Sequence, residues 1–381
     1  MTRQYDIIIA GAGGIARAAG LMLMEFSDIP PRLYIGNRSL INADKMAKWI
    51  TEGISKSIQI ETFELRDDEI SEKTGRILKK ADILLDCLPG SLAPKMARLA
   101  REYGLHYANL TEYVAETDEI IEMARDADTG FVLQTGLAPG LIDVLGHYLF
   151  QQFCEVYQVT KADKLELKVG ALTRHAVAPH YYGFTWSPVG VATEYLKEAI
   201  VVRDFKETKL RALSERAKII IDGITYEEDL TSGGAADLPK SLENKLRSLD
   251  YKTLRFPGHY AWVDSQLSSF KNTAEAISSL QSKMEEVIPH IEEDQIVLYA
   301  SVEGKDAKGT LRKLEISRTI LPQKVGKHLL RAIQTTTAAP LLQSAFYLLE
   351  NAPRGIILQS QLPAAQFLKG HFNTEVYGKL V

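Results

Sequence analysis

The 381-residue sequence has little cysteine, no long apolar run and no excess of positive charge. Its two cysteines, Cys87 and Cys154, lie far apart in apolar surroundings, which argues against a disulfide framework or a thiolate zinc site and favours a reducing compartment. No run reaches the roughly 18 apolar residues of a membrane-spanning helix, and the first residues lead directly into a predicted strand, so neither a membrane segment nor a signal peptide is expected. A net charge of -4 offers no basic surface to nucleic acid. The expectation is a cytoplasmic globular protein.

The first third of the chain alternates short apolar runs with helical patterns. Apolar runs separated by about 10 to 15 helical residues predict right-handed βαβ units and a parallel sheet covered on both faces. The predicted strands fall in the segments 5–12, 31–38, 58–65, 76–90, 105–113 and 130–140.

A glycine-rich motif, GAGGIA, directly follows the first predicted strand and opens the first predicted helix. Gly11 permits the tight turn, Gly13 lets the backbone approach a pyrophosphate, and Ala16 lets helix and strand pack closely. A helix N-terminus also offers unpaired N–H groups and a positive dipole end to phosphate. The motif therefore predicts a dinucleotide site that includes Gly14 and Ile15. A tight turn without a ligand is the alternative interpretation.

The second predicted strand ends without the acidic residue that NAD-binding chains usually have about 20 residues after the motif. Asn37, Arg38 and Ser39 stand at that point. An acid would bind the ribose hydroxyls and repel a 2′-phosphate, whereas Arg38 offers phosphate a bidentate donor and Ser39 a hydroxyl. We expect NADP(H) in preference to NAD(H), with a solvated surface arginine as the alternative. The other residues expected to line the cofactor crevice are Cys87, Leu88 and Pro89.

The pattern changes after residue 140. A long helical pattern over 141–156 is followed by an alternating strand over 164–175 and by further strands and helices, among them a polar helical segment over 264–288. This pattern predicts a mixed or antiparallel sheet flanked by helices. We expect a dinucleotide-binding domain over 1–140, with 345–381 packing back near it, and an α+β domain over 141–344.

Several motifs spread over the chain carry a family resemblance. They are GAGGIA (11–16), LTEYV (110–114), TGLAPGLID (135–143), YGFTWSPVGV (182–191), TLRFPGH (253–259) and the C-terminal stretch 335–363. Together they resemble the saccharopine dehydrogenase (saccharopine reductase) and lysine 6-dehydrogenase family. The sequence departs from that family at Gln361 and Ala364–Ala365, and in the loop 170–180, where the departure concerns the substrate pocket.

The resemblance implies a Rossmann doubly wound parallel sheet with an inserted α+β substrate domain. Members transfer a hydride between a nicotinamide ring and a carbon bonded to nitrogen in an amino acid or polyamine derivative, and several are dimers. We therefore expect a homodimeric NADP-dependent oxidoreductase of the CH–NH type that reduces an imine or runs the reverse reaction. Lysine 6-dehydrogenase and carboxynorspermidine dehydrogenase chemistry are close alternatives. A non-catalytic NADP(H)-binding sensor is the alternative of another class.

Two residues are candidates for the chemistry itself. Tyr113 follows the fifth predicted strand, whose carboxyl end is expected to face the crevice, and its phenol can donate a proton to the reacting nitrogen. Asp143 opens the helix after residue 140 and could orient a substrate amine. The alternatives are a packing tyrosine and a simple helix-capping acid.

Two arginines could anchor a substrate carboxylate. Arg255 lies beside a Pro-Gly turn, and Arg174 lies in the divergent loop. A guanidinium binds a carboxylate through two parallel hydrogen bonds. A structural ion pair that holds the loop is an equally good interpretation of Arg255.

An aromatic turn precedes the helix that Pro188 begins. Tyr182 and Trp186 are expected to form an apolar wall, and Ser187 to cap the helix. His175 and His259 are further substrate-site candidates because imidazole titrates near neutral pH. The five-residue spacing of His175 and His180 is poor for metal ligands on one helix face, so no metal site is expected.

Overall fold

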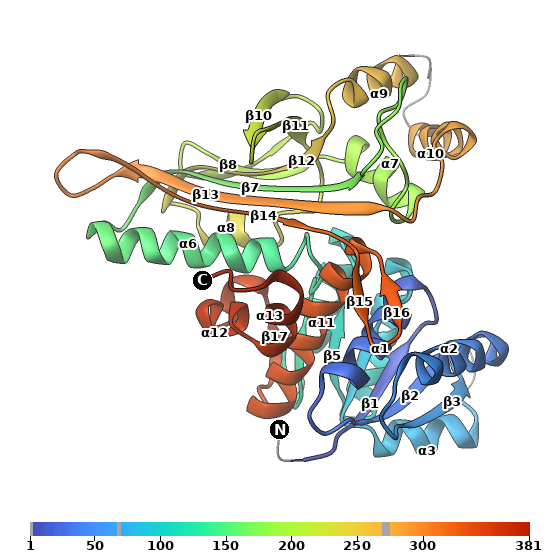
Figure 1. Ribbon diagram of the computed structural model, residues 1–381. Helices are drawn as coiled ribbons and strands as arrows, with labels where there is room; N and C mark the ends of the chain where they lie inside the picture. Colours follow the sequence, from blue (N-terminus) through green and yellow to red (C-terminus); the bar gives the residue numbers. More distant parts are fainter. Residues whose placement is uncertain (1–2, 67–69, 269–274) are drawn as a thin grey trace. The chain divides into compact units, whose positions relative to one another are not determined.

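The computed structural model describes residues 3–66, 70–268 and 275–381, which fall into two compact units (Figure 1). The first unit comprises Met1–Leu141, Gln323–Leu330 and Gln334–Val381. The second comprises Ile142–Pro322 and Arg331–Ile333. Residues 323–330 and 334–344, which the sequence pattern assigned to the second domain, thus cluster with the first unit.

Seven parallel strands form the sheet of the first unit (Figure 1). They lie in the order β17, β6, β5, β4, β1, β2, β3, so the chain starts near the middle and extends the sheet in both directions. Their bounds are β1 (Asp6–Ala10), β2 (Arg32–Asn37), β3 (Gln59–Glu64), β4 (Ile83–Asp86), β5 (His106–Asn109), β6 (Gly130–Val132) and β17 (Gly355–Ile357). This confirms the predicted doubly wound parallel sheet, whose seventh strand comes from the C-terminal segment.

Helices follow these strands along the chain. They are α1 (Gly14–Phe26), α2 (Leu40–Gly53), α3 (Glu72–Lys80), α4 (Ala93–Glu102) and α5 (Val114–Ala124), with a short 3-10 helix η1 (Gly90–Leu92) before α4. Ile77, Ala97 and Ile120, from α3, α4 and α5, share a buried cluster with strand residues. Helices α1 and α2 approach closely because Gly20 lacks a side chain: a Cβ there would lie 2.6 Å from Cδ1 of Ile50.

The C-terminal part of the chain adds a small hairpin and several helices. These are β15 (Gln323–Val325), β16 (His328–Leu330), α11 (Ala332–Asn351), the 3-10 helix η3 (Gln359–Gln361), α12 (Ala364–Leu368) and α13 (His371–Tyr377). The first two residues of α11 cluster with the second unit and the rest of the helix with the first. At this point the chain changes from the second unit to the first within a helix.

The second unit is built on a mixed sheet, as predicted. Its main path is β10, β11, β12, β7, β13, β14, and β8 pairs with both β12 and β9. The bounds are β7 (Ala162–Thr173), β8 (Ala199–Arg203), β9 (Lys206–Leu210), β10 (Ala217–Ile221), β11 (Ile224–Leu230), β12 (Leu246–Arg255), β13 (Asp294–Lys305) and β14 (Leu311–Ile320). Strands β12 and β7 are parallel, whereas β7 with β13 and β13 with β14 are antiparallel.

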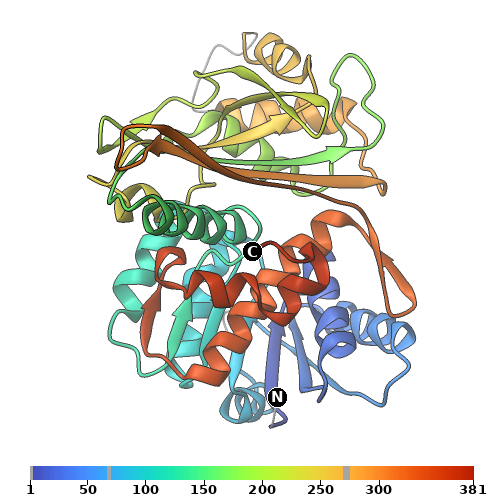
Figure 2. The same ribbon diagram turned by 60° about the vertical axis from the view of Figure 1, so that its left-hand side comes forward.

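Five helices are described around this sheet. They are α6 (Leu141–Tyr157), α7 (Pro188–Leu196), α8 (Leu238–Ser241), α9 (His259–Leu267) and α10 (Ala276–Val287). Helix α6 runs along one face of the sheet in both views (Figures 1 and 2), and a Cβ at Gly146 would overlap the Leu167 side chain of β7. Helices α7, α9 and α10 share a separate buried cluster. Of the helical segment predicted over 264–288, residues 269–274 lie outside the described residues.

Candidate functional site

The glycine turn between β1 and α1 has the two properties that a phosphate-binding turn needs. Gly11 has a φ of 115°, and a Cβ there would lie 3.0 Å from the Cys87 carbonyl oxygen, so a side chain is excluded by conformation and by space. Gly13 caps α1, and a Cβ on it would meet no atom within 4 Å. The backbone of Gly13 and Gly14 is exposed at the N-terminus of α1, Ile15 is half-buried and Ala16 is buried. The turn therefore leaves room for a phosphate at a helix N-terminus.

The end of β2 presents a cation to solvent. Asn37 accepts a hydrogen bond from the Ser39 backbone N–H at 2.9 Å, which shapes the turn before α2, and Ser39 occupies the N-cap position. Arg38 is exposed, and its side chain forms no hydrogen bond or ion pair with any residue in the described parts of the chain. An exposed guanidinium at the end of β2 is available to a phosphate.

The turn after β4 is fixed by a buried acid. Asp86 is 2% exposed, and its carboxylate accepts hydrogen bonds from the Tyr107 hydroxyl at 2.8 Å and the Leu88 N–H at 2.9 Å. Burial raises the pKa of Asp86 to about 6, against the lowering effect of these two bonds. Burial and the charge of Asp86 raise the pKa of the Cys87 thiol, so it stays protonated near neutral pH. Pro89 is exposed and leads into η1.

Tyr113 stands at the N-cap of α5, just past the carboxyl end of β5. Its N–H donates to Oγ1 of Thr111 at 3.2 Å, and its ring packs where a Cβ on Gly90 would lie, 2.9 Å from Cδ2. Burial, followed by the negative charges of Glu112 and Glu116, raises the pKa of its phenol. At neutral pH the phenol is therefore protonated and can act as a donor.

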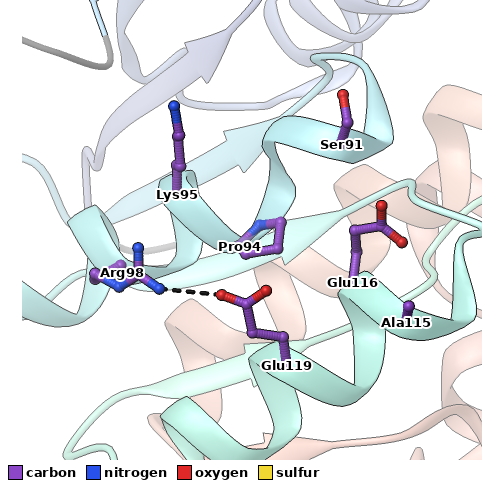
Figure 3. A pocket seen from close by; sticks show the side chains of 7 residues that line it. All are labelled: Ser91, Pro94, Lys95, Arg98, Ala115, Glu116 and Glu119. Atoms are coloured by element: carbon purple, nitrogen blue, oxygen red, sulfur yellow. Dashed lines mark hydrogen bonds and ion pairs between the residues drawn. The ribbon is translucent and has the colours of Figure 1, made fainter.

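A pocket of about 340 Å³ lies between α4 and α5 in the first unit (Figure 3). It is lined by Ser91, Pro94, Lys95, Arg98, Ala115, Glu116 and Glu119. Arg98 and Glu119 form an ion pair at 3.0 Å across it, and both side chains are more than half exposed. None of the sequence-predicted site residues lines this pocket, although Ser91 lies two residues beyond Pro89.

In the second unit, the divergent loop carries Arg174 and His175 on its exposed part. His175 lies 3.1 Å from Glu293, but the two side chains are 74% and 68% exposed, so this pair contributes little to stability. The Arg174 side chain forms no ion pair with any residue for which the structure gives a position. Arg174 is the more accessible of the two predicted carboxylate partners.

The aromatic turn before α7 lies partly in the hydrophobic core of the second unit. Tyr182 is 2% exposed, and Trp186 is half-buried over Gly190, where a Cβ would overlap its ring. Ser187 accepts a hydrogen bond from the Gly190 N–H at 3.3 Å, and Pro188 begins α7, which confirms the predicted cap.

Arg255 and His259 meet Tyr182 in the interior of the second unit. Arg255 is 1% exposed, donates to Glu194 at 2.7 Å, and lies 4.8 Å from the centroid of the Tyr182 ring. The His259 ring centroid lies 5.0 Å from that of Tyr182. Arg255 thus has a carboxylate partner within its own unit, and a substrate carboxylate would have to replace Glu194. Its role in substrate binding remains a prediction.

Asp143 is fully buried in the first turn of α6. The proposed contact with a substrate amine would require exposure of its carboxylate, so this role also remains a prediction. Sequence reasoning did not single out Glu194 or Tyr195, the polar partners of Arg255. Their segment has no distinctive motif, and only the tertiary contact identifies them.

Across residues 3–66, 70–268 and 275–381, no group of three or more His, Cys, Asp or Glu side chains is arranged to hold a metal ion. Within those same ranges, no helix has the length and apolar character needed to cross a membrane.

Two family models match consecutive parts of the chain. The saccharopine dehydrogenase NADP binding domain matches residues 7–133, and the saccharopine dehydrogenase C-terminal domain matches residues 136–371. Among curated proteins, the alpha-aminoadipic semialdehyde synthase of Arabidopsis thaliana is 26% identical over 206 residues. That match covers 50% of this chain but only 19% of the plant protein.

Solved structures share the fold. The apo, histidine-tagged saccharopine dehydrogenase (L-Glu forming) of Saccharomyces cerevisiae matches with a TM-score of 0.76 at 16% identity, over 98% of both chains. A homospermidine synthase of Legionella pneumophila, solved in complex with NAD, matches with a TM-score of 0.69 at 13% identity, over 100% of this chain and 91% of that one. At these identities the likeness concerns architecture.

Proposed function

The chain belongs to the saccharopine dehydrogenase family, and on that premise we propose that it interconverts an amino-acid-derived imine and the corresponding secondary amine. Membership makes it an NADP-binding oxidoreductase that acts on CH–NH donors. The observation that carries the proposal is the succession of the two family models, over residues 7–133 and 136–371, the first of which contains the open glycine turn.

The cofactor would supply the hydride, and the protein would hold the reactants and move a proton. In the reducing direction a C–H bond forms at the imine carbon, the π electrons of C=N pass to nitrogen, and nitrogen takes a proton. We assign that proton to the Tyr113 phenol, because it lies just past the carboxyl end of β5 and a phenol is protonated at neutral pH. Gly13 and Gly14 would bind the pyrophosphate.

Cofactor choice rests on Arg38. Its exposed guanidinium at the end of β2 would pair with the 2′-phosphate, and Asn37 and Ser39 would shape the turn that presents it. NADP(H) is therefore the proposed physiological cofactor.

Substrate anchoring is assigned to Arg174 in preference to Arg255. The Arg174 side chain is exposed, whereas Arg255 is 1% exposed and already paired with Glu194. A carboxylate that approached Arg255 would have to displace a partner from a buried ion pair, which costs several kcal/mol. The substrate is thus a carboxylate-bearing amine such as saccharopine, lysine or a carboxylated polyamine.

We further propose a cytoplasmic homodimer. Both cysteines are free thiols in the structure, as expected in a reducing compartment. Light scattering after size exclusion would test the oligomeric state, and a monomer at all concentrations would contradict it.

The deciding experiment is a turnover panel followed by the absorbance of the reduced nicotinamide. Amines paired with aldehydes are tested in the reducing direction, and saccharopine, lysine and carboxylated polyamines in the oxidising direction. Turnover with at least one of them supports the proposal. Tight NADPH binding without any turnover would instead indicate an NADP(H)-binding sensor.

A further inference from the structure

Four residues of the second unit form a continuous chain of hydrogen bonds. Arg255 donates its Nε–H to the Tyr195 hydroxyl oxygen at 2.6 Å, and that oxygen lies 3.0 Å from Nε2 of His259. On its other side, Nδ1 of His259 lies 2.6 Å from the backbone carbonyl oxygen of His180. Arg255, Tyr195 and His259 are 1%, 2% and 0% exposed, so water does not compete for the bonds among these three side chains.

The hydrogens of this chain have one consistent arrangement. A carbonyl oxygen only accepts, so Nδ1 of His259 carries the hydrogen. Burial, together with the charge of Arg255, lowers the pKa of His259 to about 3, so the ring is neutral near pH 7 and its Nε2 accepts. An arginine only donates, so the Tyr195 hydroxyl hydrogen points to His259. Arg255 and Tyr195 therefore fix the Nδ1–H tautomer of His259.

Two further hydrogen bonds hold Arg255 in place at the start of this chain of hydrogen bonds. Its Nη2 donates to Glu194 at 2.7 Å and its Nη1 to the Leu254 carbonyl oxygen at 3.0 Å. A buried ion pair adds little net stability compared with apolar residues, and its clearest benefit is to select one conformation. Here the fixed position of Arg255 orients the Tyr195 hydroxyl, which in turn orients the His259 ring.

This chain of hydrogen bonds ends at the loop 174–181, which leads from β7 toward the aromatic turn. The side chains of residues 174–179 are exposed. Tyr181 has a φ of 47°, a left-handed conformation that costs a residue with a side chain of order 1 kcal/mol or more. Its ring packs where a Cβ on Gly258 would lie, 2.6 Å away. Contacts from the start of α9, including the bond from His259, compensate for this cost.

We propose that His259 is a positioning residue that sets the conformation of the loop 174–181 and thereby the substrate preference of the enzyme. It acts through its Nδ1–H bond to the His180 carbonyl oxygen, because that loop presents Arg174 to the substrate carboxylate. The second half of this inference rests on the proposed function, whereas the control of the loop by His259 does not.

A matched pair of variants separates the two nitrogens of the ring. The amide nitrogen of asparagine reaches the place of Nδ1, so His259→Asn retains the donor to His180. The amide of glutamine reaches the place of Nε2, so His259→Gln loses that donor. We expect His259→Gln to raise the KM for the amine substrate about five- to tenfold, with a smaller change in kcat and an unchanged KM for NADPH. His259→Asn should restore most of the substrate affinity. Equal KM values in the two variants would overturn the proposal.

Hydrogen exchange of residues 174–181 in the protein without substrate gives a readout that is independent of turnover. His259→Gln should accelerate exchange in this loop, and His259→Asn should return it toward the rate of the unmutated protein. If both variants exchange alike, the positioning role is refuted even where the enzyme is active. An unmutated protein without turnover refutes the proposed function and leaves the exchange experiment to decide the loop.

Tyr195→Phe provides a second route if His259→Gln does not fold. Loss of the hydroxyl removes the donor to Nε2 but leaves the His180 carbonyl oxygen as the acceptor for Nδ1–H, so the Nδ1–H tautomer should persist while the nitrogen chemical shift of Nε2 moves to that of a nitrogen without a hydrogen bond. The unmutated protein should show the Nδ1–H tautomer, with the Nε2 shift of a nitrogen that accepts a hydrogen bond. An Nε2–H tautomer in the unmutated protein, or an unchanged Nε2 shift in Tyr195→Phe, would contradict the proposed chain of hydrogen bonds.

Discussion

Substitution of Asp86 by asparagine should change how the stability of the first unit depends on pH. Asp86 is 2% exposed and its pKa is raised to about 6 by burial, from an ordinary value of 3.8. Because the folded carboxyl holds its proton more tightly than the unfolded one, the folded state is favoured below pH 3.8, and this contribution is lost as pH rises through about 6.

The magnitude follows from the two pKa values. A difference of about two pH units corresponds to about 3 kcal/mol between pH 4 and pH 8. Asparagine can keep the contact with Leu88 through its carbonyl oxygen, and the Tyr107 hydroxyl has a second acceptor in the Ala93 carbonyl oxygen at 3.2 Å. Between pH 4 and pH 8, the free energy of unfolding of the variant should therefore rise by about 3 kcal/mol relative to that of the unmutated protein. This corresponds to roughly 6 to 10 °C in the unfolding midpoint of a unit of this size.

Thermal unfolding should be measured with and without the substitution at several pH values from 4 to 8. The informative quantity is the difference between the two proteins at each pH, since it cancels the titration of all other groups. Asp82→Asn serves as a control, because the Asp82 side chain is 21% exposed and pairs with the exposed Arg3. A difference between Asp86→Asn and the unmutated protein that stays constant over the whole pH range would refute the reasoning.

Three further predictions concern the cofactor turn and a helix cap. Arg38→Ala should weaken NADPH binding about ten- to hundredfold and NADH binding much less, measured by fluorescence titration; equal affinity of the unmutated protein for both cofactors would contradict the assigned role. Gly13→Thr should leave the unfolding midpoint nearly unchanged, because a Cβ there meets no atom within 4 Å and threonine caps a helix about as well as glycine, yet weaken NADPH binding; Gly11→Ala should destabilise the fold because of its φ of 115°. Ser187→Ala should cost about 1 kcal/mol in urea unfolding through loss of the bond from Gly190, and Ser187→Asp should retain it.

The parallel sheet was predictable because its central strands are buried on both faces and read as apolar runs. Two central strands of the second sheet, β12 and β13, were not predicted. In β12, Asp250 and Lys252 are buried, so the sequence lacks the apolar alternation of an ordinary strand. Arg203 lies 2.8 Å from Asp250, and Glu228 lies 3.6 Å from Lys252. These partners lie on other strands and neutralise the two charges. Because they are distant in the sequence, no local pattern predicts the pairing.

In the candidate site, too, some residues were predictable from the sequence and others only from the tertiary structure. The spacing of Gly11 and Gly13 and the cap at Ser187 are local features of the sequence, so the sequence located them, although Gly11 also packs against the Cys87 carbonyl oxygen. Arg255 presented two equal interpretations, a substrate clamp or a structural ion pair. The distinction depends on Glu194, which lies 61 residues away along the chain.

The sequence by itself determined the βαβ order, the glycine turn that opens α1 and the absence of an acid at the end of β2, because each follows from residues close together in the chain. Only the tertiary structure decided that Arg255 is buried against Glu194, that Tyr195 links it to His259, and that His259 reaches the loop at His180. Those contacts join residues of two helices, a strand and a loop, and the energy that selects them exists only once these elements pack together.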